Sequence, residues 1–266
     1  MDGMGYELAP EVRAYYDERG EQVRLRTGGA GTLEFLRTQD ILRRVLPPAP
    51  ARVLDVGGAS GIHAEWLAAD GYAVHVVDPV PWHVEASAAL PGVTAALGDA
   101  RALAADDRWY DAVLLLGPLY HLVERADRVG ALREAARVVR PGGVVAAATI
   151  SRYAVLLEAM RSGWHDLQHV VYEVLATAVS PPALPGFTTA YFHRPEDVPP
   201  EFAAAGLGEV AQYAIEGPAW LYGNLRDQLA DPALRTDLMN GLRAVEQVPS
   251  MHGASSHLLT VARCDL

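Results

Sequence analysis

The sequence predicts an α/β fold built on an open, mostly parallel sheet. Short apolar runs alternate with helical segments through the first half of the chain, a pattern typical of parallel strands joined by helices. A glycine-rich turn follows the first run, residues 52–56, and Asp78 ends the second run, residues 73–77. In such sheets ligands bind at the carboxyl ends of the strands. A glycine turn and a carboxylate at that edge therefore predict a site for a nucleoside-containing ligand.

Composition narrows the class of function. The chain has 266 residues, 50% of them hydrophobic, which suits one α/β domain with additions. Its net charge of −11 argues against nucleic acid and anionic membranes as partners. All 22 basic residues are arginine, so Schiff-base chemistry and a P-loop lysine are excluded. With the single Cys264 and no signal peptide or membrane-length apolar run, we expect a cytoplasmic protein.

Helical segments precede the first strand. Residues 6–26 carry aromatic and charged side chains at helical spacing and end at the glycine-rich break of residues 27–31. A second helix is predicted from Thr32, a plausible cap, to Leu46, before two prolines. We expect residues 1–46 to be a helical lid and residues 47–266 to be the main domain.

The main domain then alternates strands and helices. Its predicted strands and helices, in chain order, are residues 52–56, 62–69, 73–78, 81–90, 93–97, 110–116, 125–140 and 144–150. An insertion at about 151–193 carries two predicted helices and an extended arm. A helix from Glu196 to Ala205 follows, and then two strands at 209–215 and 257–262 are separated by a helical segment, 220–245.

The spacing of the glycine turn separates two classes of cofactor. Dinucleotide enzymes use G-x-G-x-x-G, but here the third position is Ala59 and the sixth is Ile62, so that fingerprint fails. The pattern Asp55-x-Gly57-x-Ala59-x-Gly61 resembles motif I of the class I S-adenosylmethionine (AdoMet) methyltransferases, with alanine for the middle glycine. Asp78, residues 98–100, 110–116 and 140–143 match further motifs of this family in order.

This resemblance implies a Rossmann-like class I methyltransferase sheet, mostly parallel with an antiparallel last strand, in the bacterial small-molecule branch. It implies AdoMet as cofactor, S-adenosylhomocysteine (AdoHcy) as product, and no metal. The cofactor-binding residues that it implies are Tyr16, Arg37, Asp55, Gly57, Gly58, Ala59, Gly61, Asp78, Pro79, Asp99, Ala100, Arg101, Leu116 and Gly117.

Some of these residues also have structural interpretations. Asp55 is expected to brace the glycine turn through backbone hydrogen bonds rather than to touch the ligand. Asp99 could cap the turn at residues 101–103, and Arg37 could lie on a solvated helix face. Tyr15 and Tyr16 could simply pack the leader helix on the core.

The tip of the fourth strand supplies the catalytic candidates. Residues 117–122 read Gly-Pro-Leu-Tyr-His-Leu, and the resemblance places Tyr120 and His121 next to the transferable methyl. If the acceptor carries a proton at attack, His121 and His193 are the candidate bases, although a histidine in a loop is commonly structural. The residues expected to bind substrate are Tyr15, Tyr120, His121, Tyr153, Tyr191, His193 and His252.

We therefore predict methyl transfer from AdoMet to a small, aromatic or heterocyclic metabolite by in-line displacement. The atom methylated, carbon, nitrogen or oxygen, is left open. An AdoMet-binding protein without catalysis and a nicotinamide-dependent oxidoreductase are the alternatives. The expected partner is a small-molecule acceptor, with no nucleic acid and no membrane, and a homodimer is left open.

Overall fold

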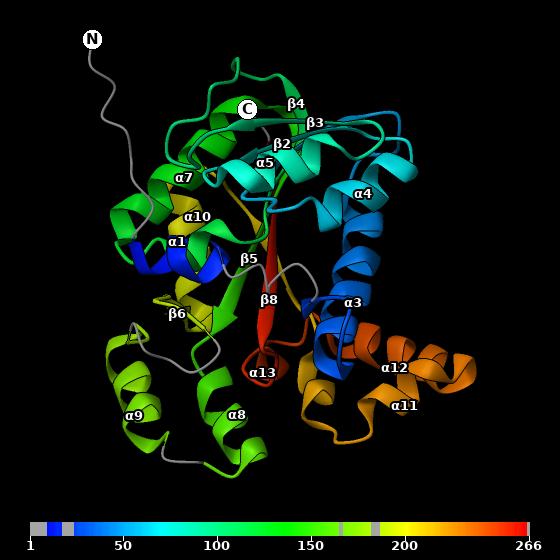
Figure 1. Cartoon of the computed structure of the whole chain (residues 1–266), viewed down its shortest axis with the longest axis vertical. Helices are drawn as coiled ribbons and strands as arrows, with labels where there is room; N and C mark the ends of the chain where they lie inside the picture. Colours follow the sequence, from blue (N-terminus) through cyan, green and yellow to red (C-terminus); the bar gives the residue numbers. More distant parts are fainter. Residues whose placement is uncertain (1–9, 18–23, 165–166, 182–186, 265–266) are drawn as a thin grey trace.

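The fold is built around one mixed sheet of eight strands (Figure 1). The computed structural model describes residues 10–17, 24–164, 167–181 and 187–264. Strand order along the sheet is β3-β2-β1-β4-β5-β8-β7, with the short β6 paired to β5. The strands are β1 Arg52–Val56, β2 Ala73–Asp78, β3 Val93–Leu97, β4 Tyr110–Leu115, β5 Val139–Ser151, β6 Phe192–His193, β7 Val210–Ala214 and β8 His257–Arg263.

The pairing confirms the predicted sheet. Strands β1 to β5 pair in parallel, whereas β8 runs antiparallel to both β5 and β7. Every residue of β4 is buried, as expected for a strand covered on both faces. The two faces carry separate apolar clusters, one around Val113 and Leu115 and the other around Ala112 and Leu114.

Helices cover both faces of the sheet. Helix α4, Ile62–Ala69, and α3, Gly29–Val45, bury Leu67, Ile41 and Leu42 in the Leu114 cluster. Helix α7, Arg125–Val138, and α10, Val198–Ala204, bury side chains in the Val113 cluster. Helix α5, Pro81–Ala88, follows β2, and α6, Pro118–His121, follows β4.

The second leader helix begins earlier than predicted. Helix α3 starts at Gly29 instead of Thr32, so the glycines counted as a break are its first turn. They serve close approach rather than chain breaking, since a Cβ on Gly31 would lie 2.2 Å from the Arg24 carbonyl oxygen. The hydroxyl of Thr32 donates to the Gly28 carbonyl oxygen at 2.7 Å. Helix α3 therefore packs in the Leu114 cluster, and α1, Pro10–Asp17, is a further described helix of the leader.

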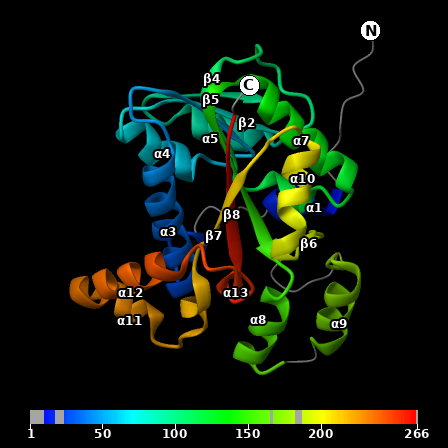
Figure 2. The same ribbon diagram turned by 180° about the vertical axis from the view of Figure 1, so that it is seen from behind.

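Two groups of helices project from the same end of the molecule. Figures 1 and 2 show α8 with α9 on one side of α13, and α11 with α12 on the other. Their bounds are α8 Ala154–Ser162, α9 Gln168–Thr177, α11 Leu225–Ala230, α12 Pro232–Val245 and α13 Pro249–His252. The predicted helix over 220–245 is thus broken, because Asp231 caps a new helix through Ala233 N–H and Leu234 N–H ahead of Pro232.

The extended arm after α9 is mostly a packing element. Of the predicted arm only β6 is a strand, and it pairs with the end of β5. Phe192, Val170 and Val174 pack with Ile150 in a small apolar cluster separate from the two main ones. None of the described helices is both long and apolar enough to span a membrane.

Candidate active site

Two pockets lie at the carboxyl edge of the sheet, one on each side of the glycine turn. The Asp78 pocket, about 1090 Å³, reaches the ends of β2 and β3, and the Asp55 pocket, about 870 Å³, reaches α3 and β8. The walls that they share come from Tyr16, Gly57, Ala59, His83 and Gly117.

The glycine turn presents bare backbone between the pockets. Gly57 and Gly61 have φ values of 67° and 86°, which are left-handed conformations that favour glycine. A Cβ on Gly57 would lie 2.7 Å from Pro118 Cγ, and one on Gly58 would lie 2.6 Å from Asp55 Oδ2. Ala59 adopts φ 48° with its side chain in place, so the alanine that departs from motif I is accommodated.

Asp78 braces the glycine turn, the role expected for Asp55. Its Oδ2 accepts from the Ala59 N–H at 2.9 Å, and its Oδ1 accepts from the Val80 N–H at 3.0 Å. The Nδ1 of His83 lies 2.8 Å from the same Oδ1. The carboxylate at the end of β2 therefore fixes the turn after β1 and still lines the Asp78 pocket.

Asp55 is buried without a partner. Its side chain lies at the end of β1, and neither carboxylate oxygen is hydrogen-bonded by any described residue. Burial, and secondarily the charge of Asp78, raise the pKa of Asp55 to about 7. Because an unpaired buried carboxylate is costly, this oxygen pair in the wall of the pocket suits a ligand cation such as an ammonium group.

The loop after β3 closes the far end of the Asp78 pocket. Asp99 accepts from the backbone N–H of Arg101 at 2.8 Å, and the Arg101 side chain binds both its oxygens. Asp99 thus caps this turn, as its structural interpretation held, while it also lines the pocket with Ala100 and Arg101. Pro79 lines the same pocket.

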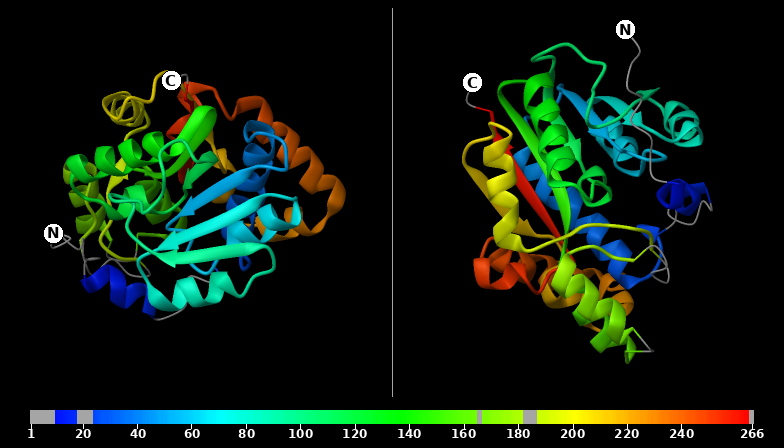
Figure 3. Two further views of the ribbon diagram at one scale, coloured as in Figure 1. Left: turned by 90° about the horizontal axis from the view of Figure 1, so that it is seen from above. Right: turned by 90° about the vertical axis from the view of Figure 1, so that its left-hand side faces the viewer.

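Aromatic residues from α1 and α6 meet over the pockets. The Tyr16 hydroxyl lies 2.7 Å from His121 Nε2, and its ring meets His83 of α5 edge-on at 5.4 Å. Tyr15 continues the cluster onto Phe187. Figure 3 shows α1 lying beside α5. Burial lowers the pKa of His121 to about 4, so its ring is neutral at neutral pH.

Tyr120 and Leu116 line the Asp55 pocket, and His121 lines the Asp78 pocket, so the tip of β4 contributes to both. Gly61 lines neither pocket. It instead lets the turn approach α5, because a Cβ there would lie 2.6 Å from Leu90 Cδ1.

Arg37 is not in the site. Its side chain is fully buried behind α3, where it binds Glu246 at 2.5 Å, Asp40 at 2.6 Å and the Ile215 carbonyl oxygen at 3.0 Å. It is therefore neither on a solvated face nor in a wall of either pocket. The leader arginine that lines the Asp55 pocket is Arg24, which binds Glu34.

Five predicted substrate residues also lie outside both pockets: Tyr15, Tyr153, Tyr191, His193 and His252. His193 is fully buried, with its Nε2 3.3 Å from Glu201. Tyr191 packs its ring on the Arg128 guanidinium, whose carbon lies 3.6 Å from the ring centroid. Burial, the largest influence, lowers the pKa of His193.

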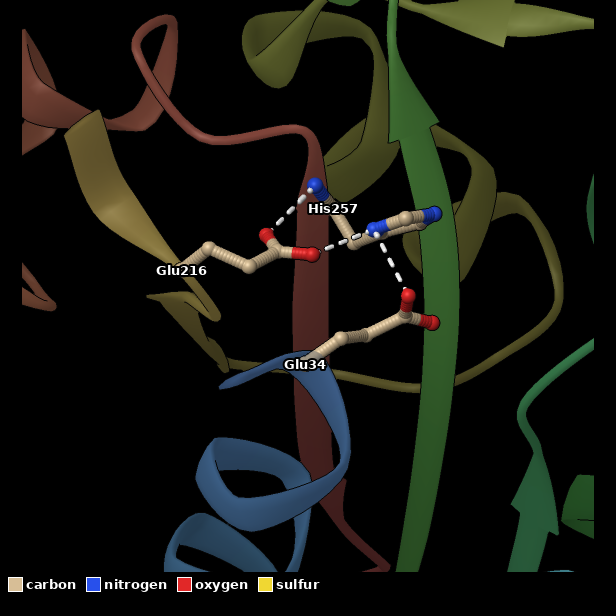
Figure 4. Close-up of side chains that lie close together, drawn as sticks. All are labelled: Glu34, Glu216 and His257. Carbon is tan, nitrogen blue, oxygen red and sulfur yellow. Dashed lines mark hydrogen bonds and ion pairs between the residues drawn. The ribbon is translucent and has the colours of Figure 1, made fainter. Parts of the chain in front are cut away.

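The site also contains residues that the sequence did not single out. Glu34, His63 and His257 line the Asp55 pocket, and Glu216 lies directly behind His257 (Figure 4). No motif marks these residues, since α3, α4 and β8 are far apart in the chain. Only His257, the first residue of a strand at the ligand-binding edge, carries a local signal.

Comparisons with known proteins point to a methyltransferase domain. Residues 53–143 match a family described as "Methyltransferase domain". An uncharacterized methyltransferase of Mycobacterium bovis is 42% identical over 100 residues, 37% of this chain and 40% of that protein. The ubiquinone biosynthesis O-methyltransferase of Methylocella silvestris is 33% identical over 124 residues, 44% of this chain and 47% of that protein.

These matches span less than half the length of the curated relatives. A solved structure of a SAM-dependent methyltransferase from Thermotoga maritima has a TM-score of 0.58, at 15% identity, over 97% of this chain and 100% of that one. This likeness shows the fold. The match places residues 53–143 in the methyltransferase-domain family, and the chain has the fold of the class I S-adenosylmethionine-dependent methyltransferases.

Proposed function

We propose that this protein transfers a methyl group from AdoMet to a small-molecule acceptor at the shared mouth of the two pockets. The observation that carries the proposal is Asp55, a buried carboxylate with no described partner beside a turn of bare backbone. The family match concerns this same segment of the chain. When bound, AdoMet supplies an electrophilic methyl group on a sulfonium that is already a good leaving group.

Each of the two pockets would hold one end of the cofactor. Asp55 and the turn at Gly57–Ala59 would receive the amino-acid end in the Asp55 pocket. The Asp78 pocket would receive the adenosine, with Asp99 and Ala100 near the base. Asp78 already accepts bonds from the turn, but a carboxylate has about four acceptor positions, so a ribose hydroxyl can be added.

The acceptor would enter beneath α1. Tyr16 and Tyr120 present aromatic faces there, which favour both a flat apolar acceptor and the sulfonium charge. Alignment of acceptor and methyl on one axis supplies most of the rate enhancement, and the aromatic cluster over the mouth excludes water. The acceptor that such a mouth favours is a small, aromatic or heterocyclic metabolite.

His121 would orient the acceptor or Tyr16 rather than take a proton. With a pKa of about 4, its ring is a weak base, although it is neutral and hydrogen-bonded to Tyr16. Such a site serves acceptors that need alignment more than deprotonation.

The test begins with calorimetric titration of AdoHcy and, separately, NADH into the protein. Binding of AdoHcy alone supports the proposal, and binding of NADH alone would point to the oxidoreductase. Labelled AdoMet with a cell extract then tests turnover. Label in a small molecule supports methyl transfer, and AdoHcy binding without any labelled product would indicate a binding protein.

A further inference from the structure

His257 lies in the wall of the Asp55 pocket, on the opposite side of the glycine turn from Asp78. It begins β8 and pairs with Ile150 at the end of β5, so it lies on the ligand-binding edge of the sheet. In the strand order, β2 and β3 lie on one side of β1, while β4, β5 and β8 lie on the other. If adenosine occupies the Asp78 pocket, His257 lies beyond the cofactor's turn, in the wall of the Asp55 pocket.

The ring of His257 is held in place by a hydrogen bond to Glu216. Glu216, whose side chain is 2% exposed, places Oε1 2.6 Å from His257 Nδ1. Its Oε2 accepts from the His257 backbone N–H at 3.0 Å and from the Ser255 hydroxyl at 2.9 Å. These bonds fix the carboxylate, which in turn fixes the imidazole. Figure 4 shows the other ring nitrogen, Nε2, pointing away from both Glu216 and Glu34.

The surroundings keep this imidazole charged. Burial opposes the charged form, but Glu34 and Glu216 outweigh it and raise the pKa of His257 to about 9, with Arg24 acting in the opposite direction. Nearby His63 stays neutral, because burial lowers its pKa to about 4. At neutral pH both ring nitrogens of His257 therefore carry hydrogen. Since Nδ1 donates to Glu216, Nε2–H is a donor for which no described residue provides an acceptor.

The same three side chains could be considered as metal ligands. Their candidate atoms lie within 4.8 Å of one another. However, the 2.6 Å separation of Glu216 Oε1 and His257 Nδ1 is that of a hydrogen bond with its proton between the atoms. Arg24, 2.5 Å from Glu34, already balances the charge of the third group. A proton, rather than a divalent cation, fits this arrangement.

We propose that Nε2–H of His257 binds a carboxylate in the Asp55 pocket, for which the methyl acceptor is one source. The proposal rests on the proposed function for the location of the acceptor. Glu216 is the positioning residue. The amino-acid carboxylate of the cofactor offers the same chemistry, and separate arms of the experiment distinguish the two sources.

The experiment uses AdoHcy-saturated protein titrated with benzoate, and with benzamide as the uncharged analogue of the same shape. Binding is followed by calorimetry and by the NMR signal of the His257 ring, assigned with His257→Gln. We expect benzoate to shift this signal and to bind about tenfold or more weakly to His257→Gln, the scale of a charged hydrogen bond. The matched control is His75→Gln, a strand histidine outside both pockets, which should bind as wild type.

The cofactor arm compares AdoHcy with methylthioadenosine, which lacks the amino-acid group. A loss of AdoHcy affinity in His257→Gln, with methylthioadenosine unaffected, would assign the carboxylate to the cofactor instead of the acceptor. Glu216→Gln should weaken benzoate binding and lower the titration midpoint of His257, an effect that a merely structural glutamate would not produce.

If neither benzoate nor AdoHcy responds to His257→Gln, the proposal is wrong while the proposed function stands, provided that AdoHcy still binds. Tight binding of Zn²⁺ that His257→Gln abolishes would also overturn it, in favour of a metal site. Failure of AdoHcy to bind the wild type is a separate result and would remove the proposed function itself.

Discussion

The protonation state of Asp55 should make the binding of the cofactor depend on pH. Its pKa of about 7 means that it is partly protonated near neutral pH, whereas an ammonium ligand requires the carboxylate. We therefore expect the affinity for AdoHcy to fall as the pH drops below about 7, by up to tenfold per unit. Calorimetry between about pH 6 and pH 8 measures this directly. Asp55→Asn should bind more weakly at pH 8 and show a flat profile, and a wild-type profile that is flat would contradict the assignment.

Asp78 provides a second residue-level prediction. It holds the turn through Ala59 and lines the adenosine pocket, so Asp78→Ala should weaken AdoHcy binding by about 1–3 kcal/mol. Asp106→Ala, an exposed aspartate in neither pocket, is the matched control and should be neutral. Equal affinities for the two variants would mean that the ribose lies elsewhere.

At the scale of elements, an ion network ties α3 to the end of α12. Arg37 has no exposed surface, and it shares Glu246 with Arg44 of the same helix. Removing Arg37 would leave buried carboxylate charge poorly compensated, so Arg37→Ala should lower the free energy of unfolding by about 3 kcal/mol or more. Urea denaturation measures this loss.

The control for Arg37 is Arg161→Ala, which removes an exposed pair with Glu158 on α8. Such pairs contribute less than about 1 kcal/mol. If the two variants lose stability equally, the buried network does not hold α3 in place. An Arg37→Ala variant that folds should also keep its affinity for AdoHcy, since Arg37 lines neither pocket.

For the whole molecule, three histidines predict how stability depends on pH. Burial lowers the pKa values of His63 and His121 to about 4, so the unfolded chain binds more protons between about pH 6.5 and pH 4, and stability falls as the pH drops. His257, with a pKa of about 9, behaves oppositely. Its contribution is complete below about pH 6.5 and is lost as the pH rises to 9.

We therefore expect the melting temperature to be highest near pH 6.5 and to fall on both sides. Each histidine can contribute at most about 3 kcal/mol. The raised pKa of Asp55 makes the folded chain bind an extra proton below about pH 7, so Asp55 offsets part of the stability lost on the acid side. Scanning fluorimetry from about pH 4.5 to pH 9.5 measures the profile. His257→Gln should flatten only the alkaline side, and an unchanged alkaline side in that variant would show that the charged imidazole does not stabilise the fold.

Local signals along the chain allowed much of this molecule to be predicted. Strands β2 and β3 and helix α4 agree with their predicted bounds, because each is a short apolar run flanked by turn residues. The glycine turn, Asp78 and Asp99 line the pockets as predicted. They could be picked out of the sequence because each follows or ends one of the adjacent strands β1, β2 and β3. Helix α3 was predicted less well, since glycines that permit close approach resemble glycines that break a helix. The segment at 220–245 was predicted as one helix, whereas Asp231 and Pro232 begin a new one within it.

By itself the sequence determined the parallel sheet and predicted the kind of cofactor and the turn that would receive it, because those features depend on short-range order. Only the tertiary structure decided that Asp78 braces the turn while Asp55 stays unpaired, and that Arg37 and His193 are buried away from the pockets. It alone brought Glu34, Glu216 and His257 together. The physical reason is that pairing and desolvation depend on contacts between α3, β7, β8 and the turns near them, which no local pattern in the chain records.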